Sequence, residues 1–338
     1  MNAERPIKLV VMIPALNEAR AIGGVIDAIP REVGAPAEIK VIVIDDGSTD
    51  ETGQIAREKG AAVLRHSRTM GLGSSFAHGL ERALEEGADV IVNIDGDGQF
   101  DPQDIPKLIQ PILEDRADFV TATRFARKDL VPNMPWVKKW GNTQMRRLVN
   151  FVTGGTPLTD VSCGFRAYNI QAALNLHLSG SFTHAHETII DLARKGLRLV
   201  EVPLKVRGER AHGESRMAKS VLVYGLRAGG MVLRALCRTR PLIVFGTLGG
   251  SIAGLGILQG LIVFIHWWRT GLTTPIRSLL IGSELFITVG FLTLVLALVA
   301  DMLDRGLDLS EKQLYFAKLA RYEEIKKRLA KPKSRSGE

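Results

Sequence analysis

Short apolar runs alternate with amphipathic stretches through the first half of the chain, which predicts strands separated by helices. We expect strands over residues 8–13, 40–44, 62–64, 89–94 and 118–123. The pattern between them predicts helices that include residues 73–86 and 102–114. Near-continuous apolar strands that alternate with helices are typical of a mostly parallel sheet covered on both faces, so the sequence predicts an α/β fold.

Polar residues directly follow three of these predicted strands. The three runs are Pro14-Ala15-Leu16-Asn17-Glu18, Asp45-Asp46-Gly47-Ser48 and Asp95-Gly96-Asp97. The carboxyl ends of parallel strands meet at one edge of a sheet, and ligands of α/β proteins bind at that edge. We therefore expect the three runs to line a single site.

Two long apolar segments dominate the second half. Residues 241–265 contain no charged residue, and residues 278–300 contain only Glu284. A bilayer span needs roughly 20 apolar residues, so both segments are long enough to cross a membrane. Basic residues crowd the outer flanks of the pair, whereas the loop between them carries only Arg269 and Arg277, so the positive-inside rule places both termini in the cytosol. A glutamate facing lipid is costly, which leaves an interfacial position or pairing in a homo-oligomer as interpretations of Glu284.

A basic amphipathic helix is predicted immediately before the first span. Arg227, Arg234 and Arg238 are spaced 7 and 4 residues apart, so they share one helix face. Such a face is either solvated or interfacial, and its position beside a span favours the membrane interface. The predicted organisation is a cytosolic catalytic domain (residues 1–218), an interfacial helix (219–240), a transmembrane hairpin (241–303) and a charged cytosolic tail (304–338).

Charge and cysteine content narrow the partners. The net charge is +8, with a pI near 9.6, which suits nucleic acid, anionic lipid or phosphorylated substrates. The predicted spans favour lipid and phosphorylated substrates, and we expect no nucleic-acid partner. The two cysteines, Cys163 and Cys237, are too few for a disulfide framework or a cysteine-rich zinc site.

The acidic strand ends carry the candidate chemistry. Asp95 and Asp97 lie in a short turn, where two carboxylates can face one Mg²⁺ or Mn²⁺ ion that bridges diphosphate oxygens. Gln99 adds a carbonyl oxygen to this set. Asp46 can accept a hydrogen bond from a nucleotide base or ribose, while Ser48 and its neighbours can also cap the following helix.

These motifs, in this order, resemble family 2 glycosyltransferases with a GT-A fold, most closely the dolichyl-phosphate mannosyltransferase group and its bacterial polyprenyl-phosphate relatives. Further matches follow along the chain as Thr123-Arg124-Phe125, the segment DVSCGFRAY (residues 160–168), Glu201-Val202-Pro203, Arg210 and Gly213-Glu214-Ser215-Arg216. The resemblance spans roughly residues 8 to 220. It departs from the family at Arg216, where lysine is usual, and arginine keeps the charge but grips phosphate differently.

The resemblance implies an inverting transfer of a sugar from a nucleoside-diphosphate sugar to a polyprenyl (undecaprenyl or dolichyl) phosphate. It implies donor binding by Pro14, Asn17, Glu18, Asp46 and Asp95, and metal binding by Asp95, Asp97 and Gln99. It implies phosphate binding by Arg124, Lys138, Arg210, Ser215 and Arg216, with Asp97, Arg124 and Arg216 central to catalysis. The enzyme would be a multi-pass protein of the plasma, inner or endoplasmic-reticulum-type membrane.

Two other functions are open at this point. A family 2 enzyme acting directly on a saccharide or glycerolipid usually needs a carboxylate base at the acceptor hydroxyl, whereas Arg124, Arg210 and Arg216 suit an acceptor that is already ionised. An inactive membrane scaffold would not need the intact Asp46, Asp95 and Asp97. A zinc site at His184 and His186 lacks a third clear ligand.

Overall fold

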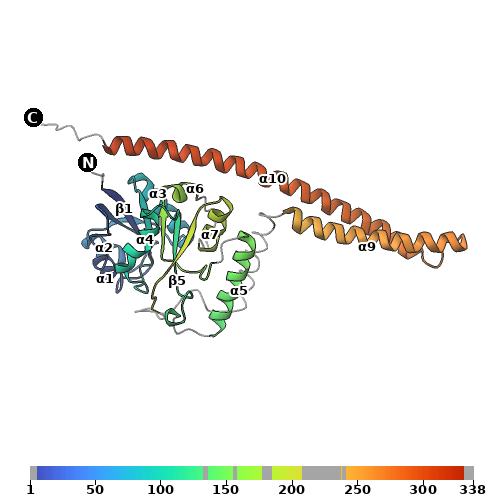
Figure 1. Cartoon of the computed structure of the whole chain (residues 1–338), viewed down its shortest axis with the longest axis horizontal. Coiled ribbons are helices and arrows are strands. Elements are labelled where there is room, and N and C mark those ends of the chain that lie inside the picture. The colour runs from blue at the N-terminus through green and yellow to red at the C-terminus, as the bar shows by residue number, and fades with distance from the viewer. Residues whose placement is uncertain are drawn as a thin grey trace, which may run out of the picture. The chain divides into compact units, whose positions relative to one another are not determined.

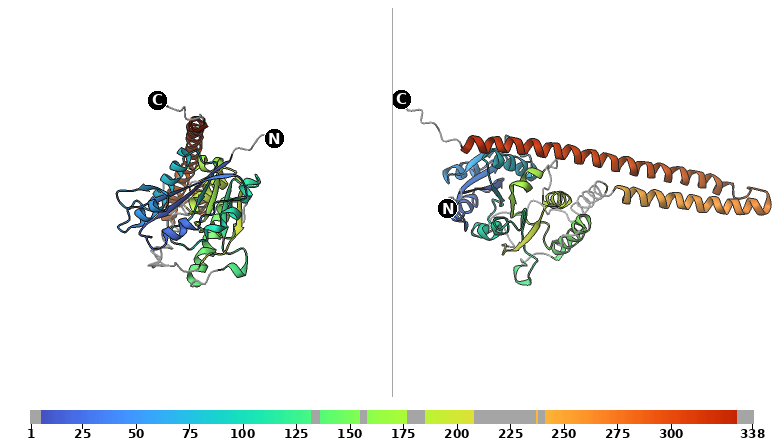
Figure 2. Two further views of the ribbon diagram at one scale, coloured as in Figure 1. Left: turned by 90° about the vertical axis from the view of Figure 1, so that its left-hand side faces the viewer. Right: turned by 45° about the horizontal axis from the view of Figure 1, so that its top comes forward.

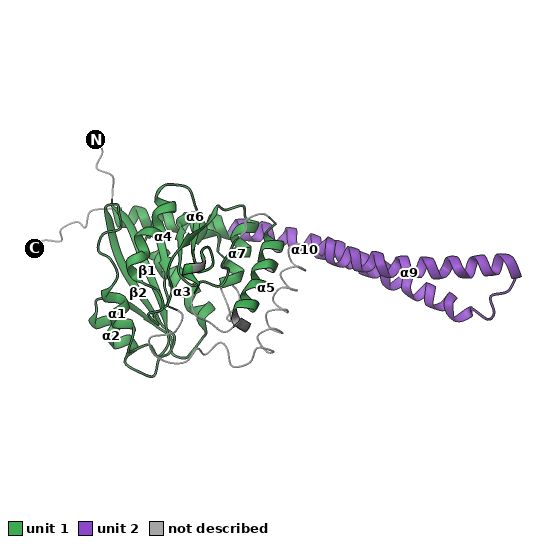
Figure 3. Cartoon of the chain, turned by 60° about the horizontal axis from the view of Figure 1, so that its bottom comes forward, with its two compact units in different colours: residues 1–221, 314–338 green, residues 222–313 purple. Residues whose placement is uncertain are grey.

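The computed structural model describes residues 6–131, 136–154, 158–176, 185–207, 237 and 241–330. Its helices and strands fall into two units, shown in green and purple in Figure 3. Unit 1 comprises Met1–Val221 together with Leu314–Glu338, and unit 2 comprises Leu222–Gln313. The C-terminal segment therefore belongs to the same unit as the predicted catalytic domain.

A seven-stranded sheet lies at the centre of unit 1 (Figure 1). Its strands are β1 (Ile7–Ala15), β2 (Ala37–Asp45), β3 (Ala62–Arg65), β4 (Val90–Asn93), β5 (Phe119–Thr123), β6 (Arg166–Asn169) and β7 (Leu199–Pro203). Their spatial order is β3-β2-β1-β4-β6-β5-β7. Among these strands only β6 runs antiparallel to its neighbours. The predicted mostly parallel sheet is thus confirmed.

Helices cover both faces of this sheet (Figures 1 and 2). Besides the final turns of α10 (Arg277–Ala330), those described in unit 1 are α1 (Ile22–Asp27), α2 (Thr52–Glu58), α3 (Leu72–Glu85), α4 (Ile105–Leu113), α5 (Trp136–Thr153), α6 (Ile170–Asn175) and α7 (Ala185–Arg194), with short 3₁₀ turns η1 (Pro102–Asp104) and η2 (Lys128–Leu130). On one face α3 packs closely, because a Cβ at Gly79 would lie only 2.8 Å from Ile44. On the other face Ile22 and Leu108 join Val11 in the main apolar core.

The five predicted strands are all present, each within a few residues of its expected bounds, and the two predicted helices correspond to α3 and to η1 with α4. The pattern did not predict β6 and β7. β6 begins with Arg166, which is fully buried although arginine normally marks a solvent-exposed position. β7 carries Glu201 in its centre, so neither strand has the continuous apolar run typical of a parallel sheet.

Unit 2 contains α9 (Pro241–Thr270) and the first part of α10 (Arg277–Ala330), which lie side by side in Figures 1 and 2. Small residues bring them together, since a Cβ at Gly249 would lie 2.9 Å from the carbonyl oxygen of Gly290. Both helices are long and apolar enough to span a membrane. Only 17% and 11% of their most apolar windows are buried, whereas the core helix of a soluble protein is mostly buried. The predicted apolar pair is therefore present, and its outward surface suits lipid.

The final turns of α10 pack against unit 1, to which they belong. The hydroxyl of Tyr322 donates to the carbonyl oxygen of Ala88 at 2.8 Å, and Tyr322 is buried. Lys326 Nζ lies 2.7 Å from Asp89 Oδ1, and Arg321 lies 2.8 Å from Glu85. The segment predicted as a charged tail thus contributes a buried aromatic side chain and ion pairs to unit 1.

Candidate active site

The turns after β1 and β2 are interlocked by side-chain hydrogen bonds. Asn17 has a positive φ of 53°, and its Oδ1 accepts from the backbone N–H of Thr49 at 2.8 Å. In return, the Asn17 N–H donates to Ser48 Oγ at 3.0 Å, and the Glu18 N–H donates to Thr52 Oγ1 at 2.9 Å. Asparagine tolerates this left-handed conformation better than most residues. The two turns predicted to meet at one sheet edge therefore form one rigid surface.

The Asp46 carboxylate organises the adjacent loop. Its Oδ1 accepts from the Met70 N–H at 2.8 Å and lies 2.7 Å from Nδ1 of His66, while its Oδ2 accepts from the Gly71 N–H at 2.9 Å. Burial alone would raise the pKa of Asp46, but the hydrogen bonds from His66, Met70 and Gly71 lower it below its ordinary value. Asp46 is thus ionised at neutral pH and fixes the loop that opens α3.

Two histidines form a chain behind Asp46 that sequence reasoning missed. Nε2 of His66 lies 2.9 Å from Nδ1 of His78, and the two rings meet edge to face. His66 is buried, so its ring supports the carboxylate from the side of the protein interior. His66 directly follows β3 and His78 lies twelve positions later in α3, and no periodic pattern links them.

Other expected donor residues differ in their setting. Pro14 is buried inside β1, where it lies beside Ile44 of β2. Pro14 therefore packs in the interior near the end of β1. The donor-binding roles of Pro14, Asn17, Glu18 and Asp46 stay predictions.

The Asp95–Asp97 turn follows β4 as expected. Asp97 is 4% exposed, and its Oδ1 accepts from the Gln99 N–H at 3.0 Å, whereas Asp95 is half-buried. The backbone of Gly164 passes so close that a Cβ there would lie 2.7 Å from Asp95 Oδ2. Asn93 fixes this approach, because its Nδ2 donates to the Gly164 carbonyl oxygen at 2.8 Å. The loop that contains Gly164 therefore forms one wall of the acidic turn.

These oxygens fit a hard divalent cation. Within the described ranges, no cluster of three or more His, Cys, Asp or Glu side chains is arranged to hold a metal ion. Mg²⁺ is commonly held by one or two carboxylates, with substrate phosphates and water completing its shell. Asp95 and Asp97 match that donor set. The zinc interpretation at His184 and His186 gains no third ligand among these residues, and His184 lies outside them.

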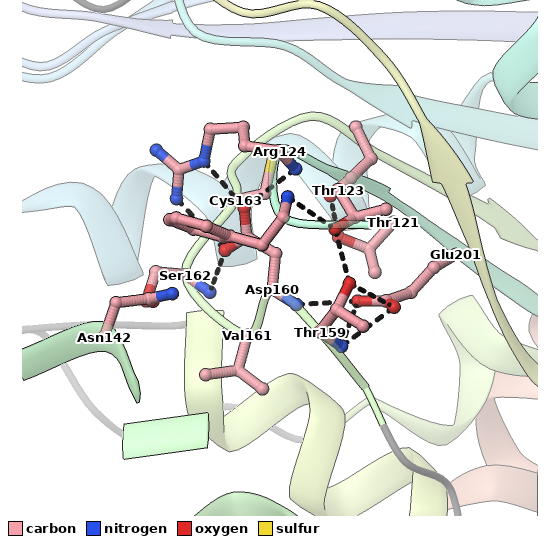
Figure 4. Close-up of polar contacts among 12 residues, drawn as sticks. Thr121, Thr123, Arg124, Asn142, Thr159, Asp160, Val161, Ser162, Cys163 and Glu201 are labelled. Carbon is pink, nitrogen blue, oxygen red and sulfur yellow. Dashed lines mark hydrogen bonds and ion pairs between the residues drawn. The ribbon is translucent and has the colours of Figure 1, made fainter. Parts of the chain in front are cut away.

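Arg124, directly after β5, is paired with the buried Asp160 (Figure 4). Arg124 Nε donates to Asp160 Oδ2 at 2.6 Å and Nη2 donates to Oδ1 at 3.0 Å, which makes the contact bidentate. Burial would lower the pKa of Arg124, but the Asp160 carboxylate and, more weakly, the Asp95 carboxylate raise it. The predicted phosphate-binding arginine is therefore permanently charged and interacts electrostatically with Asp95 of the acidic turn.

The loop that carries Asp160 and Gly164 is secured by Arg166. This side chain is fully buried and donates to the carbonyl oxygens of Cys163 at 2.7 Å, Val161 at 3.3 Å and Ala185 at 2.8 Å. Sequence reasoning gave it no role, and the Gly-Phe-Arg segment of the resemblance was the only signal. Burial raises the pKa of the Cys163 thiol to about 12, so this cysteine is a structural group and not a nucleophile.

Further polar groups, partly or fully buried, connect this loop to α5 and α7. Ser162 Oγ donates to Asn142 Oδ1 at 2.7 Å and lies 3.4 Å from His186 Nε2. Burial lowers the pKa of His186 to about 4, so its imidazole is neutral at physiological pH. These contacts hold α5 and α7 against the loop between Asp160 and Arg166.

Several predicted phosphate ligands lie outside the described residues, namely Arg210, Ser215, Arg216 and the side chain of Lys138. The interfacial helix expected over residues 219–240 also lies outside them, apart from Cys237. The segment leading toward Arg210 is described as far as Arg207. Its Arg207 N–H donates to the Gln99 carbonyl oxygen at 3.0 Å, so the segment reaches the acidic turn.

Comparison with known proteins bears on this site. A model of glycosyl transferase family 2 matches residues 10–175. The UDP-N-acetylglucosamine–dolichyl-phosphate N-acetylglucosaminyltransferase of Methanococcus voltae is 31% identical over 215 residues, covering 58% of this chain and 84% of that protein. The undecaprenyl-phosphate mannosyltransferase of Micrococcus luteus is 30% identical over 232 residues, covering 64% of this chain and 90% of that protein.

A solved structure supports the fold. Glucosyl-3-phosphoglycerate synthase from Mycobacterium tuberculosis, in complex with Mn²⁺ and UDP-glucose, superposes with a TM-score of 0.51 at 22% identity, covering 70% of this chain and 80% of that one. The likeness shows that unit 1 has the GT-A architecture. Together with the family match over the strands that carry the acidic turns, it leads to one conclusion: the chain belongs to glycosyl transferase family 2.

Proposed function

We propose that this family 2 enzyme is an inverting glycosyltransferase that moves a sugar from a nucleoside-diphosphate sugar to a polyprenyl phosphate. The observation that carries the proposal is the ionised Arg124, held bidentately by Asp160 beside the Asp95–Asp97 turn. A fixed cation next to a candidate metal site suits a reaction in which two phosphate groups must approach each other. The relatives from Methanococcus voltae and Micrococcus luteus, whose names specify dolichyl phosphate and undecaprenyl phosphate, support this choice of acceptor.

Asp95 and Asp97, with Gln99, would hold Mg²⁺ or Mn²⁺. A bound divalent cation neutralises the charge that develops on a departing nucleoside diphosphate. Supporting this part, the neighbour from Mycobacterium tuberculosis holds Mn²⁺ with UDP-glucose on the same fold. Asp97 is buried and fixed by Gln99, so its carboxylate is oriented before a ligand arrives.

The remaining residues bind and orient the two substrates. The interlocked turns that contain Asn17 and Asp46 would receive the nucleotide, and Glu18 and Pro14 would shape that surface. Arg124 would receive the acceptor phosphate, with Lys138, Arg210, Ser215 and Arg216 completing the cationic surface. A phosphate acceptor is already ionised at neutral pH, so attack on the anomeric carbon needs positioning and charge stabilisation rather than a strong base.

The acceptor is a lipid, so the proposal also includes membrane attachment. The apolar outward surfaces of α9 and α10 support it. On α5, Trp140, Arg147 and Phe151 are exposed at helical spacing, which suits an interfacial surface of aromatic and basic groups. We propose a cytosolic catalytic unit, which cysteine labelling of intact cells would test. An engineered cysteine near Thr273 should react with an impermeant reagent and one near Lys128 should not; the reverse pattern would overturn this topology.

The function is tested by offering purified full-length protein a panel of nucleotide sugars with a short polyprenyl phosphate and Mn²⁺. Mass spectrometry of the lipid fraction should reveal a glycosylated polyprenyl phosphate with at least one donor. An Asp97→Ala variant prepared in the same way serves as the control for contaminating activity. If a saccharide or glycerolipid accepts the sugar while polyprenyl phosphate does not, the proposed acceptor is wrong.

A further inference from the structure

A second carboxylate, that of the half-buried Glu201, binds the backbone of Asp160, the residue that is paired with Arg124 (Figure 4). Glu201 lies in the centre of β7, where it is aligned with Thr121 of the parallel neighbour β5. Arg124 follows the last residue of β5, so the sheet register fixes the spacing between Glu201 and the start of the Arg124 loop. Arg124 and Glu201 thus project from neighbouring strands toward the same segment of chain.

That segment is the pair Thr159 and Asp160. Glu201 Oε1 accepts from the backbone N–H groups of Thr159 and Asp160, both at 2.8 Å. Glu201 Oε2 lies 2.8 Å from the Thr159 N–H and accepts from Thr159 Oγ1 at 2.8 Å. Thr159 Oγ1 also lies 2.6 Å from Thr123 Oγ1, which ties the pair to the end of β5. One carboxylate therefore engages three donors and immobilises the backbone on both sides of the 159–160 peptide.

The Asp160 side chain continues the chain of contacts. Its carboxylate is fully buried and, besides the two bonds from the Arg124 guanidinium, it lies 3.1 Å from the Ser162 N–H and 3.3 Å from the Arg124 N–H. Nε and Nη2 of Arg124 are engaged by Asp160, and among the described residues none accepts from Nη1. The position of Asp160 therefore decides which way this third nitrogen points.

Placing two carboxylates beside one guanidinium in the interior has an electrostatic cost. Two carboxylates and one guanidinium are brought together, so the cluster carries an excess negative charge in a largely buried place. Burial, followed by the nearby Asp160 carboxylate, raises the pKa of Glu201 against the lowering effect of its hydrogen bonds. A glutamine would avoid this electrostatic cost, but its N–H₂ group would then face one of the three donors. An ionised glutamate, however, is acceptor-only and can engage all three donors at once.

We infer that Glu201 is a positioning residue for the acceptor phosphate, which sets the Arg124 guanidinium through Thr159 and Asp160 so that Nη1 faces the incoming phosphate oxygen. The inference rests on the proposed function for the identity of the ligand of Arg124. It assigns Glu201 no contact with substrate. A carboxylate that acts in this way affects the acceptor and leaves the donor nucleotide untouched.

Steady-state kinetics on four full-length proteins tests this role: wild type, Glu201→Gln, Arg124→Ala and the double variant. Glutamine places an N–H₂ group against the Thr159 N–H, so kcat/KM for polyprenyl phosphate should fall about tenfold to a hundredfold, as expected for lost hydrogen bonds to a charged group. Affinity for the nucleotide with Mn²⁺ should stay within about twofold. Glu32→Gln, the same exchange at an exposed position, is the matched control and should behave as wild type.

The double variant separates positioning from a general structural role. If Glu201 acts through Arg124, adding Glu201→Gln to Arg124→Ala should lower kcat/KM by less than about twofold further, because the two changes remove the same interaction. The inference would be overturned if the kcat/KM of the double variant fell by the product of the two single losses. It would also be overturned if Glu201→Gln had wild-type kinetics. A loss of nucleotide affinity equal to the loss for the lipid would overturn it as well.

A readout that needs no turnover keeps this inference distinct from the proposed function. In full-length protein labelled at arginine and held in detergent, the Nε–H of Arg124 should exchange slowly with solvent because it donates to a buried carboxylate. Its NMR signal is assigned by its loss in Arg124→Lys. Glu201→Gln should accelerate that exchange at least about tenfold if the pair loosens. Unchanged exchange would refute the positioning role whatever the acceptor is, whereas failure of wild type to glycosylate polyprenyl phosphate would refute the proposed function alone.

Discussion

The two sides of the candidate site are built in different ways. The donor side, at the ends of β1, β2 and β4, is held by short-range bonds between adjacent turns, such as those of Asn17 with Ser48 and Thr49. The acceptor side, at the ends of β5 and β7, depends on charged groups from distant parts of the chain, with the buried Asp160 between the partly buried Arg124 and Glu201. Turn hydrogen bonds each contribute about 1 kcal/mol, whereas breaking a buried ion pair costs several times more.

Substitutions on the two sides should therefore affect different properties of the protein. On the donor side, a substitution should alter binding of nucleotide or metal while the fold persists. On the acceptor side, the groups proposed to bind phosphate also take part in the buried contacts of the unit, so activity and stability should fall together. Four single substitutions, with effects of decreasing size, test this contrast.

The largest effect should come from Asp97→Ala on the donor side. We expect kcat to fall about a hundredfold to a thousandfold, because the proposed metal ion, which would neutralise the leaving diphosphate, loses one of its ligands. The melting temperature should fall less than for the acceptor-side variant below, since Asp97 Oδ1 accepts from the backbone N–H of Gln99 in the same turn. Assays across a Mn²⁺ titration and in excess EDTA measure the effect. Full activity of this variant, or of wild type in EDTA, would show that the reaction needs no divalent cation at this turn.

Next, Asp160→Asn on the acceptor side should lower stability as well as activity. It leaves the largely buried Arg124 without its counter-charge, which costs roughly 3 kcal/mol, the lower end of the range for buried pairs because Arg124 is partly exposed. Thermal unfolding should shift down by about 6 to 12 °C. Asp27→Asn, which breaks an exposed pair with Lys59, is the matched control and should cost well under about 1 kcal/mol. Equal shifts in the two variants would erase the proposed contrast.

Arg216→Ala should act on the acceptor alone. An arginine that binds two phosphate oxygens contributes charge-assisted hydrogen bonds, so kcat/KM for polyprenyl phosphate should fall about tenfold to a hundredfold. Arg216→Lys should restore much of that loss, because the family usually carries lysine at this position. Kinetics with varied lipid on all three proteins measure it. Activity of Arg216→Ala within about twofold of wild type would exclude Arg216 as a ligand of the acceptor.

The smallest effect should arise where the two sides touch. Gly164→Ala places a Cβ 2.7 Å from Asp95 Oδ2, so the carboxylate must move away from the loop. We expect about a tenfold rise in the Mn²⁺ concentration needed for half-maximal activity, comparable to other changes beside a metal ligand. Gly24→Ala, where the added Cβ meets no atom within 4 Å, is the control. An unchanged Mn²⁺ requirement would show that Gly164 does not shape the acidic turn.

The same contrast explains what the sequence could predict. Asp46, Asp95 and Asp97 each follow directly after an apolar strand, so parallel topology alone brings them to one edge. The sheet, its main strands and the two long apolar helices follow from hydrophobic patterning in the same way. On the donor side, the residues that meet in space are those that directly follow the predicted strands in the sequence.

The acceptor side offered no such pattern. Asp160 and Glu201 are 41 residues apart, and their contact depends on β6 and β7, which the hydrophobic pattern did not reveal. Arg166 is an ordinary surface residue by composition, yet it is fully buried because three backbone carbonyls satisfy its guanidinium. Family resemblance marked the segments that contain these residues, but only the packing shows that Glu201 holds Asp160.

A competition experiment tests whether the acceptor is a phosphate and not a hydroxyl. Full-length protein with its preferred nucleotide sugar and Mn²⁺ is given equal amounts of a polyprenyl phosphate and the matching polyprenol, which differ only in the phosphate. We expect mass spectrometry to find the sugar on the polyprenyl phosphate alone, because the proposed roles of Arg124 and its partners require a charged acceptor and no base for a hydroxyl. Sugar found on the polyprenol at a comparable rate would contradict it.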